Sequence, residues 1–200
     1  MGGYGAVTTR SRKGAVVGAI IGVLLLAAIA GGVIYYQSAE RKRLDALDYD
    51  TLGLELEALQ AVTAQIAALE PVAVPDTKPA DYAAVLANAR AAWERYTALP
   101  RRQTQLPSKR AWPGQFASAD ALAKDALDHY SMVLFYLDQR SKIKTTTPGA
   151  TATVDTDIGN VANLGNDPLH QLQARIAGMQ AQRSEREWDY TPAKPGGASR

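Results

Sequence analysis

The stretch that decides the fold is GAVVGAIIGVLLLAAIAGGVIYY, residues 14–36, in which no side chain carries a charge. As an α-helix, which rises about 1.5 Å per residue, it would extend roughly 34 Å. The hydrocarbon core of a bilayer is about 30 Å thick, so the sequence predicts a single transmembrane helix. A cleavable signal peptide has a shorter apolar core of about 7–15 residues, so the length favours an uncleaved anchor.

Glycine recurs every fourth residue within this stretch, at Gly14, Gly18 and Gly22. The three positions share one helical face, and small residues allow the backbone of a second helix to approach closely. We therefore expect this face to pack against another membrane subunit or a second copy of the chain. The alternative is that the glycines carry no partner, because glycine is common in membrane helices generally.

Basic residues flank the apolar stretch equally, with three between residues 10 and 13 and three at residues 41–43. The positive-inside rule therefore does not separate the two orientations. The free amino terminus adds a charge to the short tail, and a long C-terminal part can translocate regardless of its own charge. We expect a single-pass protein of the bacterial inner membrane, with a cytoplasmic N-terminus and an extracytoplasmic C-terminal domain.

The composition of the chain after the span limits its fold and its chemistry. Residues 37–200 hold 19 basic and 20 acidic side chains, a poor match to nonspecific nucleic-acid binding, which needs a basic face. The chain has no cysteine, which excludes disulfides, thiolate metal sites and cysteine nucleophiles. Alanine accounts for 36 of the 200 residues, and the polar segments are mostly helix formers. The extramembrane part is therefore predicted to be all-α.

Apolar residues spaced three and four apart predict four helices after the span. Together they form one helical domain at residues 37–190. A basic tail at residues 1–13 and the span precede this domain, and a flexible tail at residues 191–200 follows it. The predicted ranges are about 37–70, 81–99, 117–144 and 168–188.

Three of the predicted boundaries have specific causes. Prolines between residues 71 and 79 should end the first helix, and Ser118 or Asp120 is the expected N-cap of the third. Asp167 followed by Pro168 has the order of an N-cap and a first helical residue, which makes residues 145–166 a long loop.

The short loop between the first two helices favours antiparallel neighbours, and two hairpins that share one core make a four-helix, up-down bundle the simplest arrangement. In such a hairpin Arg95 would lie close to Glu55 as a surface ion pair. A longer coiled-coil stalk carrying a smaller helical head is the main alternative.

The loop between the second and third helices is strongly basic. It holds Arg101, Arg102, Lys109, Arg110 and Trp112, and no acidic residue. If the first helix is straight and the second folds back along it, the loop lies at the membrane-proximal end. There it could bind lipid headgroups or an acidic partner. The alternative is a solvated loop whose Trp112 packs on the end of the bundle.

The sequence contains only weak matches to catalytic or metal-binding motifs. Asp125 and His129 stand four apart on one predicted helix, a spacing more often found in a surface contact than in a metal site. Asp155 and Asp157 resemble the start of a calcium loop, but residue twelve of that loop is Asn166 and not the required Glu. We predict no catalytic residue, no metal and no cofactor.

These features favour a non-enzymatic accessory or scaffold subunit of a larger membrane protein complex, with membrane lipid and other membrane subunits as partners and no nucleic acid. A ligand-binding or sensory helical domain that acts through a partner is the first alternative. A small membrane-anchored enzyme without a recognisable motif is the second.

Overall fold

The computed structural model describes residues 12–99, 105–143, 149–188 and 190, with side chains from residue 20 onward. These residues form four α-helices and one short 3₁₀ turn, and no strand occurs among them. The helices are α1 (Arg12–Ala67), α2 (Pro79–Thr97), α3 (Gly114–Lys142) and α4 (Ala152–Glu185), and the turn is Glu70–Val72. The all-α prediction is confirmed. The two terminal tails of the sequence prediction fall almost wholly outside the described residues.

The chain divides into two compact units, Met1–Asp45 and Ala46–Arg200. In the first unit the described residues belong to α1, whose large apolar side chains from Ile20 to Ile34 are all about half exposed or more. Among the described residues, α1 is the one helix long and apolar enough to cross a membrane, and none of its apolar window is buried.

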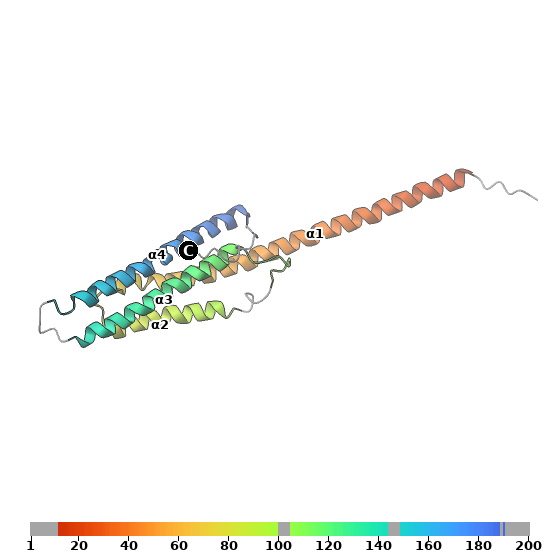
Figure 1. Ribbon diagram of the computed structural model, residues 1–200. Helices are drawn as coiled ribbons and strands as arrows, with labels where there is room; N and C mark the ends of the chain where they lie inside the picture. The colour runs from red at the N-terminus through yellow and green to blue at the C-terminus, as the bar shows by residue number, and fades with distance from the viewer. Residues whose placement is uncertain (1–11, 100–104, 144–148, 189, 191–200) are drawn as a thin grey trace, which may run out of the picture. The chain divides into compact units, whose positions relative to one another are not determined.

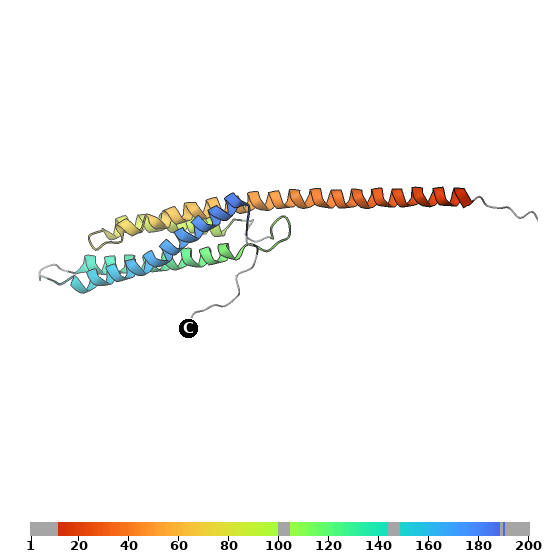
Figure 2. The same ribbon diagram turned by 90° about the horizontal axis from the view of Figure 1, so that it is seen from above.

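The second unit consists of the remainder of α1 together with α2, α3 and α4 (Figure 1). Successive helices run in opposite directions, and the view from above shows α4 passing from the side of α3 towards α1 (Figure 2). Every helix contributes to one apolar core, and burying a Leu or Ile side chain there is worth about 1.5–3 kcal/mol. The largest fully buried side chains are Leu52, Leu56, Leu59, Ile66, Leu69, Tyr82, Leu86, Leu106, Tyr130, Leu137, Ile158 and Leu169.

Helices α3 and α4 make the most extensive contact of the described helix pairs. Small residues make this possible, because Ala119, Ala123 and Ala126 line the buried face of α3, and Gly165 lies opposite on α4. A Cβ added to Gly165 would stand 3.4 Å from the ring of Tyr130, so the glycine leaves just enough room for that side chain. The alanine-rich composition thus produces a close helix hairpin.

Two buried tyrosines tie three helices together through their hydroxyl groups. Tyr82 of α2 donates to the carbonyl oxygen of Tyr130 on α3 at 2.8 Å, and Tyr130 donates to Oδ1 of Asn166 on α4 at 2.5 Å. Burial raises the pKa of both phenols, most strongly for Tyr82, where the neighbouring Tyr130 adds to the effect. Both side chains are therefore neutral donors at physiological pH.

The prediction that α4 begins at Pro168 was wrong. The helix begins at Ala152 and contains Pro168, so most of the expected loop is helical. Proline removes one backbone hydrogen bond and costs about 3 kcal/mol inside a helix. Ile158 and Val161, in the part of the helix before Pro168, are nonetheless buried, and burying two such side chains is worth about 3–6 kcal/mol, which offsets that cost. Residues 145–148 lie outside the described residues.

Two further local predictions were wrong. Helix α3 begins at Gly114, preceded by Pro113, and neither Ser118 nor Asp120 caps it. Asp120 lies within the helix and accepts a hydrogen bond from the Tyr96 hydroxyl at 2.9 Å. The surface pair of Arg95 and Glu55 does not form either, because Glu55 is fully buried. Arg95 donates from Nε to the carbonyl oxygen of Ala91 on its own helix.

An ionic cluster centred on Arg140 joins the connection that precedes α2 to α3 and α4. The guanidinium of Arg140 binds the carboxylate of Asp155 and reaches Oδ1 of Asp76 at 3.0 Å. Thr151 donates to the second oxygen of Asp155 at 2.8 Å. Desolvation alone would raise the pKa of Asp155, but the hydrogen bonds from Arg140 and Thr151 outweigh it and lower the pKa.

Candidate functional site

The glycine face predicted for the membrane helix lies in α1. Gly14 and Gly18 fall in its helical backbone, within the range where side chains are not described. At Gly22 an added Cβ would meet no atom within 4 Å. The same is true of Gly31 and Gly32. In the single chain, Gly22, Gly31 and Gly32 therefore each have open space where a side chain would stand.

The basic loop is described only in part, because Arg101 and Arg102 lie outside the described residues. Its remainder forms a tight turn, in which the Lys109 amide donates to the Leu106 carbonyl at 2.7 Å. Lys109 itself has a φ of 63°, the left-handed conformation that closes such turns. Leu106 is buried in the core, so the turn is attached to the bundle and not merely solvated.

A carboxylate of α1 holds this turn in place. Asp48 is fully buried and accepts a hydrogen bond from the Ser108 amide at 2.9 Å and a second, short one from the Ser108 hydroxyl. Hydrogen bonds to a charged acceptor stabilise by about 1.5–3 kcal/mol each, more than neutral ones. The Asp48–Ser108 contact therefore fixes the basic loop against α1. Neither residue was predicted from the sequence to have this role.

Four aromatic side chains next to the turn pack against one another. Trp112 packs edge-on against Phe116 at 5.7 Å between ring centroids, and Phe116 stacks on Trp188 at 5.9 Å. Tyr49 meets Trp188 edge-on at 6.3 Å. Trp112 is partly buried in this cluster. Trp112 therefore packs on the bundle, and contact of the loop with lipid or an acidic partner stays a prediction.

The charged side chains beside this cluster differ in their surroundings. Lys109 and Arg110 are both exposed, and the Arg110 guanidinium lies over the ring of Tyr190 at 4.8 Å from its centroid. The Tyr49 hydroxyl donates to the Arg183 carbonyl at 3.1 Å, and burial is the main cause that raises the pKa of Tyr49. Both described cations of the loop, Lys109 and Arg110, therefore remain accessible to a partner.

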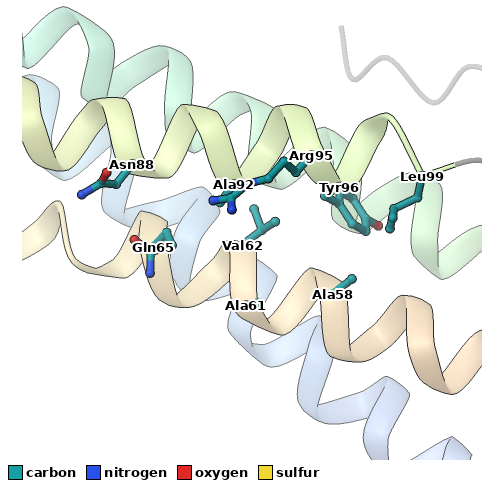
Figure 3. A pocket seen from close by; sticks show the side chains of 9 residues that line it. All are labelled: Ala58, Ala61, Val62, Gln65, Asn88, Ala92, Arg95, Tyr96 and Leu99. Atoms are coloured by element: carbon teal, nitrogen blue, oxygen red, sulfur yellow. The ribbon is translucent and has the colours of Figure 1, made fainter.

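A groove between α1 and α2 is a concave feature that was not predicted from the sequence. It has a volume of about 450 Å³. Figure 3 shows its lining, which consists of Ala58, Ala61, Val62 and Gln65 on α1 and Asn88, Ala92, Arg95, Tyr96 and Leu99 on α2 and just beyond it. The small side chains of both helices leave the trough open. Ala58 and Ala61, three residues apart on α1, were the available signal.

The residues singled out for metal chemistry make ordinary surface contacts. His129 approaches Asp125 at 3.5 Å within α3, and Asp125 is 60% exposed. Asp155 and Asp157 lie within α4, and Asp155 is bound by Arg140, so the resemblance to a calcium loop does not hold. Among the described residues no group of three His, Asp or Glu side chains gathers as a metal site would require.

No protein-family model, curated protein or solved structure matches this chain. The chemistry of the described surfaces is therefore the basis for a functional proposal. Those surfaces offer an uncovered apolar helix, a loop anchored to the bundle, and a groove with one cation. Each is suited to binding.

Proposed function

We propose that this chain is a non-enzymatic, single-pass, membrane-anchored accessory or scaffold subunit of a larger membrane protein complex. The observation that carries the proposal is the exposure of the apolar part of α1. Its large apolar side chains from Ile20 to Ile34 are 49–69% exposed, although they belong to a stretch of high hydropathy. A core helix of a soluble protein would be mostly buried, so lipid or another protein is the natural covering of this surface.

The glycine face gives the proposal a contact surface. Gly14, Gly18 and Gly22 follow one another in steps of about 40° around the helix, taking about 100° per residue. In a bilayer, helices associate through close packing of such small residues, because lipid provides no hydrophobic drive between them. A partner helix on this face would leave the second unit available for contacts outside the membrane.

Replacement of Gly18 tests the association. We expect Gly18→Leu to separate the chain from copurifying membrane subunits, or to reduce a homo-oligomer to a monomer, in native mass spectrometry from mild detergent. Ala30→Leu is the matched control, because it adds similar bulk about 120° around the helix from the centre of the glycine face. A free monomer in the unmodified protein would count against the subunit proposal. An unchanged complex in both variants would exclude the glycine face as the contact.

We further propose that the chain resides in a bacterial inner membrane with its N-terminus in the cytoplasm. The sequence contains no cysteine, so single cysteines report on topology without interference. Ser184→Cys, on the exposed surface of α4, should react with a membrane-impermeant maleimide in intact spheroplasts, whereas Ser11→Cys should react only after lysis. The reverse pattern would establish the opposite orientation. Release of the protein by alkaline carbonate would show that the segment is not an anchor.

A further inference from the structure

The groove between α1 and α2 is polar at one end and apolar at the other. Gln65 and Asn88 lie across from each other at the polar end, and Ala58 and Leu99 lie at the apolar end (Figure 3). Val62, which is almost fully buried, forms part of the floor. Small-molecule sites are typically apolar clefts of about 300–1,000 Å³ with a few converging polar groups, and this groove fits that description.

Arg95 supplies the one charge among the residues that line the groove. Its side chain extends along the trough over Ala92, towards the end that holds Gln65 and Asn88 (Figure 3). Its Nε is bonded to the carbonyl oxygen of Ala91, and among the described residues no carboxylate pairs with the rest of the guanidinium. Arg95, Gln65 and Asn88 therefore bring N–H donors to one end of the groove, and an anionic group would satisfy them.

The length and lining of the groove suit a small, elongated ligand. From Asn88 to Leu99 it runs about 16 Å along α2, at 1.5 Å per residue. Small apolar side chains line it between its two ends, namely Ala61 and Val62 on α1 and Ala92 on α2. A single apolar chain that lies along this length from Ala58 and Leu99 places its head group at Arg95.

We propose that the groove between α1 and α2 binds a single-chain amphiphile with an anionic head, such as a fatty acid, with the carboxylate at Arg95 and the chain along Ala58 and Leu99. The site goes beyond the role of accessory subunit and does not depend on it. It requires neither the glycine face nor a particular orientation in the membrane.

Photolabelling of the full chain in phosphatidylcholine nanodiscs tests the site. The probe is decanoate carrying a diazirine at the end of its chain, and the readout is the ratio of label on residues 58–65 and 88–99 to label on residues 20–36. We expect an excess of unlabelled decanoate to suppress this ratio. Decanol and decyltrimethylammonium, which lack the negative charge, should leave it unchanged.

Substitutions separate a defined site from partition into lipid. Arg95→Gln should lower the labelling ratio about tenfold, since a charged hydrogen bond is lost. Arg95→Lys should retain most of it, and Ala92→Phe, which fills the trough, should abolish it. Arg175→Gln, on the lining of a separate groove between α3 and α4, is the matched control and should have no effect. Equal labelling in Arg95→Gln, or equal competition by decanol, would overturn the proposal, and circular dichroism verifies that each variant is folded.

Discussion

At the scale of single residues, Asp155 is the side chain that most clearly makes the free energy of unfolding depend on pH. Its hydrogen bonds from Arg140 and Thr151 lower its pKa in the folded chain. A lowered pKa stabilises the fold above the unfolded value of about 3.9, and this contribution is lost as the pH falls through the folded value. Acid should therefore weaken the connection that Arg140 makes between α3, α4 and Asp76.

We expect Asp155→Asn to lower the free energy of unfolding at pH 7, and the difference from the unmodified chain to shrink below about pH 4. Urea unfolding between pH 3 and pH 7 measures both effects. Asp157→Asn is the matched control, because it removes a carboxylate two residues along the same helix that takes no part in the Arg140 cluster. The explanation fails if the two variants follow the same pH dependence.

Single residues are also where prediction from the sequence failed most often. Glu55 was expected at the surface as the partner of Arg95, yet both it and Asp48 are fully buried. Their spacing contained the signal, since Asp48, Leu52, Glu55 and Leu59 recur every three or four residues on the buried face of α1. A charged residue that shares the spacing of the buried apolar residues lies on the same helical face, but this spacing alone does not predict that it is buried. Whether such a carboxylate finds a donor, as Asp48 does at Ser108, depends on a turn 60 residues away.

At the scale of helices, the close approach of α3 and α4 depends on Gly165. A leucine there would push into Tyr130, and overpacking of this kind costs about 1–3 kcal/mol. We expect Gly165→Leu to lower the thermal midpoint by several degrees in a circular dichroism melt. Gly159→Leu, on the same helix but with open space around it, should be neutral or slightly stabilising, because leucine is the better helix former. Equal destabilisation would mean that the effect comes from the helix and not from the packing.

The number and type of the helices could be predicted from the sequence, because apolar spacing survives in each of them. The start of α4 could not, since Asp167–Pro168 is a strong local signal for a helix N-terminus. The burial of Ile158 and Val161 against the rest of the bundle overrides that signal, and such tertiary burial is not visible locally. The groove was missed for a similar reason. In the sequence, the alanines of the groove predict only that the segments are helical. The distance between α1 and α2, which leaves the groove open, is determined by how the helices pack.

At the scale of the whole molecule, the chain divides at Asp45 into two compact units, and we expect the second to fold by itself. Its apolar core draws on all four helices and, among the described residues, includes none before Leu52. We expect a fragment of residues 46–200 to be helical and soluble without detergent, and to unfold in one cooperative transition. Circular dichroism with thermal or urea unfolding checks this. A broad, noncooperative transition would show that the unit needs the first 45 residues.

The hydrogen bond from Tyr49 to the Arg183 carbonyl joins positions 134 residues apart, and Arg183 also binds Glu57 at 3.1 Å, 126 residues away. During synthesis α3 and α4 can pair soon after both emerge, because they are neighbours in sequence. The contacts of α1 with the end of α4 must wait until α4 has been synthesised. At about 5–20 residues per second, the start of the domain therefore waits roughly 6–30 seconds for its final partner. In a nascent chain the part of α1 that contacts α4 therefore stays uncovered by α4 until that helix has been made.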